Sequence, residues 1–308
     1  MVQMVTVGNL QLQPTEAAQG WDPPGIIDNP DVVVTTGDII DLQDSDTPDA
    51  DLSQSLVADG IAFYESLQSA YQCPLLVVPG VSDPAEAIKQ SVDRIDDVWL
   101  LDDCRITTND LSVDTTAEPF EFIGWTFKKY DGKNIIEYID FDRFSAVFRE
   151  PQMGHDELMT VCAQRIEECI ADYILDKSTA AQLASKLMVS RPQRNQFITA
   201  LEMLKINHQQ LKSIITSASG IPILCTPNFP FTVNLNDVFS NKNILAGSIA
   251  LKMVILATCV KLVVGGHSHP DESILVRKGR SLTHVASHPS SGVTGIDLTP
   301  GLPPKISQ

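Results

Sequence analysis

Acidic and imidazole side chains follow two apolar runs that lie far apart in this sequence. The first run, residues 32–35, is followed by Asp38, and the second, residues 261–265, is followed by His267 and His269. Carboxylate and imidazole groups bind Mn, Fe and Zn in proteins, and Asp38 offers the oxygen that can bridge two such ions. A metal centre of this kind polarises a phosphoryl oxygen and activates a water molecule. The two segments therefore predict a metal-dependent phosphoester site.

The elements that must position these side chains are the strands of an α/β sheet. Short apolar runs alternate with segments of helical periodicity, a rhythm typical of βαβ units. In an open sheet the carboxyl ends of parallel strands hold the ligands, and a glycine in the following turn lets the backbone approach closely. The expected strands lie at residues 4–7, 32–35, 74–78, 120–125, 134–139, 221–226, 261–265, 273–276, 281–286 and 292–298, with helices at 53–69 and 84–90.

Residues 155–216 differ in character from the rest of the chain. Glycine and proline almost vanish there, and apolar residues recur three and four positions apart. This spacing is typical of helices that bury one face. The sequence therefore predicts a core in two parts, residues 1–150 and 217–308, interrupted by a helical insertion or cap at residues 151–216.

Five loops occur in the order of the motifs of calcineurin-like metallophosphoesterases. Gly-Asp-x-x-Asp is present at residues 37–41 and Gly-His-x-His at 266–269, whereas the loops at 8–11, 80–83 and 226–228 occupy the places of the other three motifs. The chain resembles that superfamily over nearly its whole length. The resemblance implies an α/β fold, a two-sheet α/β/β/α sandwich of the metallophosphoesterase type with a helical insertion, and hydrolysis of phosphoric esters at a pair of divalent metals.

The resemblance also implies roles for single residues. It makes Asp38 the carboxylate that bridges two metals, His269 a ligand of the first metal and His267 a ligand of the second. Asp41 and Asp83 resemble acids that orient the metal ligands from behind.

Several motif positions have changed, and the change removes electron-pair donors. The residues now present are Asn9 and Gln11 at the places of the first Asp and His, Val81 and Ser82 at those of a metal-binding Asn and the catalytic His, and Pro227 or Asn228 at that of a lone His. A dinuclear centre brings about four positive charges, which its protein ligands must compensate. Ser82 has no imidazole to protonate a leaving alkoxide.

These losses favour a catalytically degenerate protein that uses the scaffold to bind a partner protein, a nucleic acid or a phosphorylated ligand, with one divalent metal or none. The alternative is a working phosphodiesterase or phosphatase with a reduced ligand set. One divalent Mn, Fe or Zn ion is then held by Asp38, His267 and His269 with Asn9 or Asn228, since three protein ligands and a water suffice for a hydrolytic metal. Purely structural roles remain open too, with Asp38 as a helix cap and the histidines in an exposed loop.

The composition of the chain limits its partners. Its 308 residues carry a formal net charge of -17, which argues against general attraction to nucleic acid or anionic membranes. The sequence predicts no signal peptide and no transmembrane span. Six scattered cysteines without a CxxC pair fit a reduced, cytoplasmic protein. The acidic surface serves solubility or, as an alternative, a high-salt cytoplasm.

The predicted insertion contrasts with this acidity. Residues 177–215 contain six basic residues and one acid. Within them, residues 178–191 resemble the first half of a helix-turn-helix, which places Arg191, Arg194 and Asn195 at the front of a recognition helix. The alternative is an ordinary helical cap with a solvated basic face. Nucleic acid bound here is expected to bind weakly and to be released by salt, because the rest of the chain is acidic.

Overall fold

The computed structural model describes most of the chain as two compact units. The described residues are 1–8, 10, 12, 27–37, 39, 50–80, 83–114, 118–126, 133, 135–233, 245–258, 260–265, 274–278, 281–286 and 293–307. The core unit consists of residues 1–126, 214–228 and 258–308, and the helical unit consists of residues 127–213 and 229–257.

The first sheet of the core unit has the strand order β14-β13-β1-β2-β3-β4. Strands β1 to β4 run parallel to one another, and β13 and β14 extend the sheet in antiparallel fashion, with Val2 opposite Leu298. The strands are β1 (Val2–Val7), β2 (Val32–Thr35), β3 (Leu75–Val77), β4 (Val98–Leu100), β13 (Val293–Leu298) and β14 (Lys305–Ser307). Two helices, α2 (Ala50–Tyr71) and α3 (Ala85–Val92), make the crossovers between the parallel strands.

The second sheet of the core unit has the order β11-β12-β10-β7-β6-β5. Its four inner strands are parallel and its two edge strands antiparallel. The strands are β5 (Arg105–Thr107), β6 (Phe120–Gly124), β7 (Ile221–Thr226), β10 (Leu262–Gly265), β11 (Ile274–Lys278) and β12 (Ser281–Ala286). β7 and β10 are adjacent although Lys261 comes 35 positions after Thr226 in the chain.

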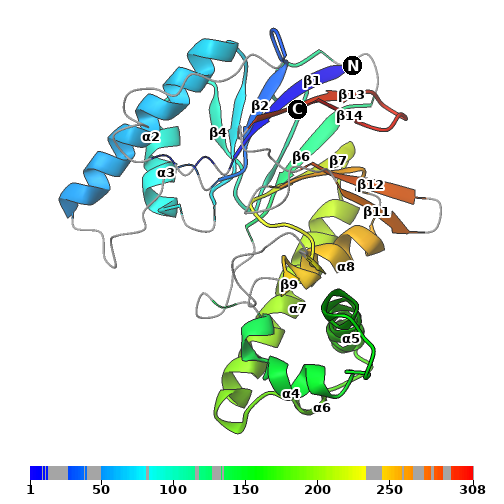
Figure 1. Cartoon of the computed structure of the whole chain (residues 1–308). Helices are drawn as coiled ribbons and strands as arrows, with labels where there is room; N and C mark the ends of the chain where they lie inside the picture. Colours follow the sequence, from blue (N-terminus) through cyan, green and yellow to red (C-terminus); the bar gives the residue numbers. More distant parts are fainter. Residues whose placement is uncertain are drawn as a thin grey trace. The chain divides into compact units, whose positions relative to one another are not determined.

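Alternation along the strands divides the apolar side chains between two layers. Val32 and Val34 of β2 pack with Ile223 of β7 and Val264 of β10, so this layer fills the space between the two sheets. Val33 points to the other face and packs with α2 and α3, which lie side by side against the first sheet (Figure 1). The predicted α/β fold with a two-sheet core is therefore confirmed.

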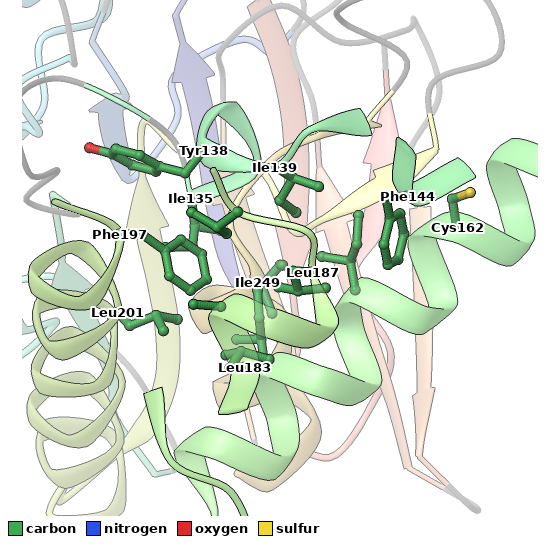
Figure 2. Packing of buried hydrophobic residues seen from close by; sticks show 14 of the residues in the cluster. Ile135, Tyr138, Ile139, Phe144, Cys162, Leu183, Leu187, Phe197, Leu201 and Ile249 are labelled. Atoms are coloured by element: carbon green, nitrogen blue, oxygen red, sulfur yellow. The ribbon is translucent and has the colours of Figure 1, made fainter. Parts of the chain in front are cut away.

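The helical unit is built around five helices and two short 3₁₀ turns within its described residues. These elements are η2 (Ile135–Tyr138), α4 (Phe141–Ala146), α5 (His155–Ile174), α6 (Ala180–Lys186), η3 (Arg191–Gln193), α7 (Arg194–Thr216) and α8 (Ile249–Ala257), with the small hairpin of β8 (Thr232–Val233) and β9 (Leu245–Ala246). The last residues of α7 belong to the core unit. Figure 2 shows Leu183, Leu187, Phe197 and Leu201 gathered in the apolar centre of this unit, where all four are fully buried.

One predicted strand is wrong, and the helical unit differs in extent from the predicted insertion. Residues 134–139 were expected to form a strand, but Ile135–Tyr138 form the 3₁₀ helix η2. Ile135 and Tyr138 are buried three positions apart, as one face of a helix requires, and both join the core of the helical unit. That unit also takes in residues 127–150 and 229–257 beside the predicted helices.

In the part of the chain that the structure describes, no helix combines the length and the hydropathy needed to cross a membrane.

Candidate functional site

The carboxyl ends of β2 and β3 are held in direct backbone contact by two glycines. Gly37 follows β2 with a φ of +80°, and a Cβ atom built on it would lie 2.1 Å from the Cα atom of Gly80, which follows β3. No side chain fits in that space, and the positive φ also disfavours any residue other than glycine. The backbone at Gly37, just before Asp38, is therefore packed directly against the backbone at Gly80, two residues before Ser82.

Asp83 joins the same two turns through hydrogen bonds. Its Oδ2 atom accepts a hydrogen bond from the backbone N–H of Gly80 at 2.8 Å, and its Oδ1 atom accepts one from Ile39 at 3.3 Å. The side chain is buried, with 8% of the residue exposed. Burial raises the pKa of the nearby Tyr64 well above its usual value of 10.0, and the charge of Asp83 raises it further. Asp83 thus acts as a brace between the turns after β2 and β3.

The ends of the two sheets meet at the same edge of the core unit. The hydroxyl of Thr126, just after β6, donates a hydrogen bond to the carbonyl of Pro79, just after β3, at 3.4 Å. Two residues earlier, a Cβ atom on Gly124 would lie 1.9 Å from the carbonyl oxygen of Leu101. The hydrogen bond between Thr126 and Pro79 places the ends of β3 and β6 together within the core unit.

In the second sheet, Asn228 occupies the turn after β7. Its backbone N–H donates to the hydroxyl of Thr226 at 3.1 Å, and a Cβ atom on Gly265, at the end of β10, would lie 2.8 Å from the carbonyl of Asn228. The turn after β7 and the end of β10, which leads to His267, are therefore packed closely. As in the first sheet, a glycine allows the approach.

The side-chain amide of Asn228 is buried, with 9% of the residue exposed, and its Nδ2 atom has no hydrogen-bond partner among the residues that the structure describes. A buried amide without a partner costs free energy, so this side chain has hydrogen-bonding capacity to offer at the carboxyl end of β7. The amide can be turned to present either its oxygen or its nitrogen. It therefore fits a metal ion through Oδ1 or a phosphoryl oxygen through Nδ2.

Most of the predicted metal ligands lie outside the described residues. Asn9, Asp38, His267 and His269 are in this group, and so is Ser82, at the place of the catalytic His. Within the described ranges, no group of three or more His, Cys, Asp or Glu side chains gathers in a way that could hold a metal ion. Pro227 has no side-chain donor, so of the two residues predicted for the lone His position only Asn228 can contact a ligand.

Two threonines at the strand ends were not predicted as site residues. Thr35, the last residue of β2, is fully buried, and within the described part of the chain its hydroxyl has no hydrogen-bond partner. Thr226, the last residue of β7, is also fully buried and holds the backbone of Asn228. The sequence signal that could have found them is a polar residue at the end of an apolar strand, just before a turn.

In the helical unit, the three residues predicted for a nucleic-acid contact have different surroundings. Arg191 and Asn195 are exposed at the start of η3 and α7. Arg194 is half-buried, and its Nη2 atom donates to the hydroxyl of Ser185 on α6 at 3.2 Å. Arg194 therefore ties α6 to α7, while Arg191 and Asn195 are available at the surface.

Comparison with known proteins shows likeness at the level of the fold. No protein-family model and no curated protein sequence matches the chain. One solved crystal structure matches 99% of this chain and 98% of its own at 11% identity, with a TM-score of 0.54. A protein of Thermus thermophilus (TM-score 0.45, 11% identity) and a phosphopantetheinyl hydrolase of Mycobacterium tuberculosis (TM-score 0.41, 13% identity) each match 94% of this chain and 90% of their own. The chain thus shares its fold from end to end with a solved protein.

Proposed function

We propose that this protein is a catalytically degenerate, metallophosphoesterase-like scaffold that binds a phosphorylated ligand at the carboxyl ends of its strands. The observation that carries the proposal is the engagement of Asp83. Both of its oxygens accept backbone hydrogen bonds, from Gly80 and Ile39, which supports a role for this acid in holding the loop. The preceding residue, Ser82, supplies no imidazole.

The loss of that imidazole has a predictable cost for catalysis. General-acid assistance to a leaving group contributes roughly 100-fold to 10,000-fold in rate. The changes at residues 9, 11, 81 and 227 remove further donors to the two metals. The glycine contacts at Gly37 and Gly265, in contrast, keep the loops close together. A scaffold that keeps its loop geometry while losing its donors is suited to binding more than to hydrolysis.

Asn228 supports a phosphorylated ligand as the occupant. Its buried, unpartnered Nδ2 atom can donate to a phosphoryl oxygen without adding a charge to the site. Neutral donors of this kind can bind a phosphoryl oxygen without a metal ion. The buried hydroxyl of Thr35 is a second unpartnered polar group at the carboxyl end of a strand in the same unit.

The test combines a metal count with a turnover assay on the whole chain. The protein is purified with added Mn, its bound metal is measured by mass spectrometry, and hydrolysis of bis(p-nitrophenyl) phosphate is followed both at moderate and at molar salt. The proposal predicts less than one metal per chain and no turnover above the metal-only blank. Stoichiometric metal with turnover that His267→Ala abolishes would overturn it.

A second candidate function is hydrolysis with a single metal, and the orphaned amide of Asn228 favours it too. Turned to present Oδ1, this side chain can complete a site with Asp38, His267 and His269. A metal bound there would act as a Lewis acid and activate water. Asn228 would then be its neutral oxygen ligand, and the braced loops after β2 and β3 would limit the movement of the site.

Replacing Asn228 by Asp separates the two candidates by the sign of the effect. A carboxylate repels a phosphoryl group, so the scaffold proposal predicts weaker binding of inorganic phosphate by calorimetry. The same carboxylate attracts a cation, so the single-metal candidate predicts tighter binding of Mn and retained turnover. Asn109→Asp makes the same change of charge at an exposed turn and is the matched control. Tighter Mn binding in Asn228→Asp alone would reject the metal-free scaffold.

A further inference from the structure

Helices α6 and α7 of the helical unit follow each other through a short turn, which is the order of elements in a helix-turn-helix. α6 opens with a capping box, in which the Thr179 hydroxyl accepts from the backbone of Gln182 and the Gln182 side chain accepts from the backbone of Thr179. It ends in a tight turn where Met188 has a φ of +57°. The chain then enters η3 and α7. The backbone thus makes the sharp turn between two helices without the glycine usual at such a position.

The two helices are fixed relative to each other by apolar packing. Leu183, Ala184 and Leu187 from α6 and its end are fully buried, as is Phe197 on α7, and Val189 in the turn is 4% exposed. All belong to one apolar cluster with α5 (Figure 2). The hydrogen bond from Arg194 to Ser185 adds a polar link. This packing leaves the opposite side of the first turns of α7 facing solvent.

The exposed start of α7 carries side chains suited to contact with nucleic acid. Arg191, Asn195, Gln196 and Thr199 are all exposed. Arg forms bidentate hydrogen bonds with guanine, Asn and Gln do so with adenine, and Thr contacts either base edges or phosphate. Asn195 and Thr199 are four positions apart on α7 and therefore share one face of the helix.

The charge of this segment also favours a polyanion. Residues 177–215 hold six basic residues and one acid, within a chain of net charge -17. Lys177 and Lys205 are paired with Asp172 and Asp176, so their charges are partly neutralised. Lys186 and Arg191 are exposed and form no ion pair with any residue that the structure describes.

We propose that the segment from α6 to the first turns of α7 is a DNA-binding helix-turn-helix, with the start of α7 in the major groove of duplex DNA. The exposed residues at its front are those that a recognition helix uses, and the cations of Lys186 and Arg191 lie beside them. The acidic remainder of the chain opposes binding. The affinity for non-specific duplex is therefore expected near the weak end of the usual range, roughly 10⁻⁴ M.

The test is fluorescence anisotropy of a labelled duplex of about 30 base pairs and mixed sequence, titrated with the full-length chain at several salt concentrations. Arg191→Gln is expected to weaken binding about fivefold and to reduce the slope of log K against log salt by about 1. Lys212→Gln is the matched control, because it removes the same charge at an exposed position near the end of α7, about 27 Å along the helix from its first residue. It should leave the affinity within about twofold of the unchanged protein.

Recognition of a specific DNA base sequence is tested separately with a pool of duplexes that carry a random central segment. The double variant Asn195→Ala, Gln196→Ala is expected to lose the base enrichment that the unchanged chain selects, while its affinity for the mixed duplex persists. Circular dichroism at each salt concentration verifies that every variant is folded. No duplex binding at any salt at which the chain is folded, equal loss in Arg191→Gln and Lys212→Gln, or tighter binding of a single-stranded RNA of equal length would each overturn the proposal.

Discussion

The carboxylate of Asp83 is hydrogen-bonded to the backbone N–H of Gly80, three residues earlier, at 2.8 Å, in a buried turn at the end of β3. Its second oxygen holds Ile39 from the neighbouring strand end. The turn after β3 is thereby tied to the turn after β2. Asp83 is thus a structural link between the two turns, and the residue before it in the chain is a serine.

Replacement of Asp83 by Ala is predicted to destabilise the core unit by roughly 2–5 kcal/mol, because two buried backbone N–H groups lose their acceptor. Urea denaturation followed by tryptophan fluorescence measures the change. Asp93→Ala removes an acid from an exposed ion pair with Lys89 and is expected to cost at most about 0.5 kcal/mol. Equal losses in the two variants would contradict the bracing role of Asp83.

Gly37→Ala is predicted to be severely destabilising, by more than about 3 kcal/mol, because the added Cβ would collide with the backbone of Gly80. Gly301 provides a matched control. It has nearly the same φ, +79°, but no atom within 4 Å of a built Cβ. Gly301→Ala should therefore cost only the strain of the backbone conformation, about 1 kcal/mol. A similar melting temperature for both variants would show that the close approach is unimportant.

Glu121 offers a test of a buried acid outside the candidate site. It is 1% exposed and accepts hydrogen bonds from the backbone of Ser219 and Gly220 and from the hydroxyl of Ser219, and it also pairs with Arg105. Glu121→Ala is predicted to cost about 3–5 kcal/mol, since the turn into β7 loses its acceptor.

The half-exposed partner of Glu121 should matter much less. Solvent screens the charge of Arg105, so Arg105→Ala is expected to cost about 1 kcal/mol or less in the same denaturation experiment. If Arg105→Ala were as damaging as Glu121→Ala, the ion pair and not the backbone hydrogen bonds would be the main stabilising interaction.

Stability should depend on pH through His208 of α7. Burial, and secondarily the charge of Lys212, lowers the pKa of this histidine from its usual value of 6.5. The unfolded chain therefore binds the proton more readily than the folded chain. Stability is fully present above pH 6.5 and declines as the pH falls below it. Between about pH 7 and pH 5, the free energy of unfolding should therefore fall less in His208→Gln than in the unchanged protein. Denaturation curves recorded at each pH measure the difference.

The strands that carry the site could be predicted because their signals are local. β2, β7 and β10 are apolar runs that end in Thr or Gly, and the structure places them within one residue of the expected bounds. The strand predicted around Ile135 failed because the short run Ile-Ile-Glu-Tyr-Ile fits both a strand and a helical period, and packing in the helical unit selected the helical one. β14 was missed because its short, largely polar sequence becomes a strand only by pairing with β13.

The site itself was less accessible to prediction. The resemblance predicted Asn228 as a weak ligand candidate, but its burial is a property of the folded core unit, where Gly265, far away in the chain, packs against its backbone carbonyl. The hydrogen bond from Ile39 to Asp83 likewise joins turns 44 residues apart. Such relationships arise only when the sheets assemble. Residue types alone therefore could not reveal that Asp83 links two turns or that the amide of Asn228 is buried.

Anomalous scattering from crystals grown with Mn tests the central claim most directly. The account predicts no pair of ions at the carboxyl ends of β2 and β10, and a phosphoryl oxygen beside the amide of Asn228 when inorganic phosphate is added. Two anomalous peaks about 3.5–4 Å apart next to Asp38 would mean that the chain holds the dinuclear centre of a hydrolase, which contradicts the account.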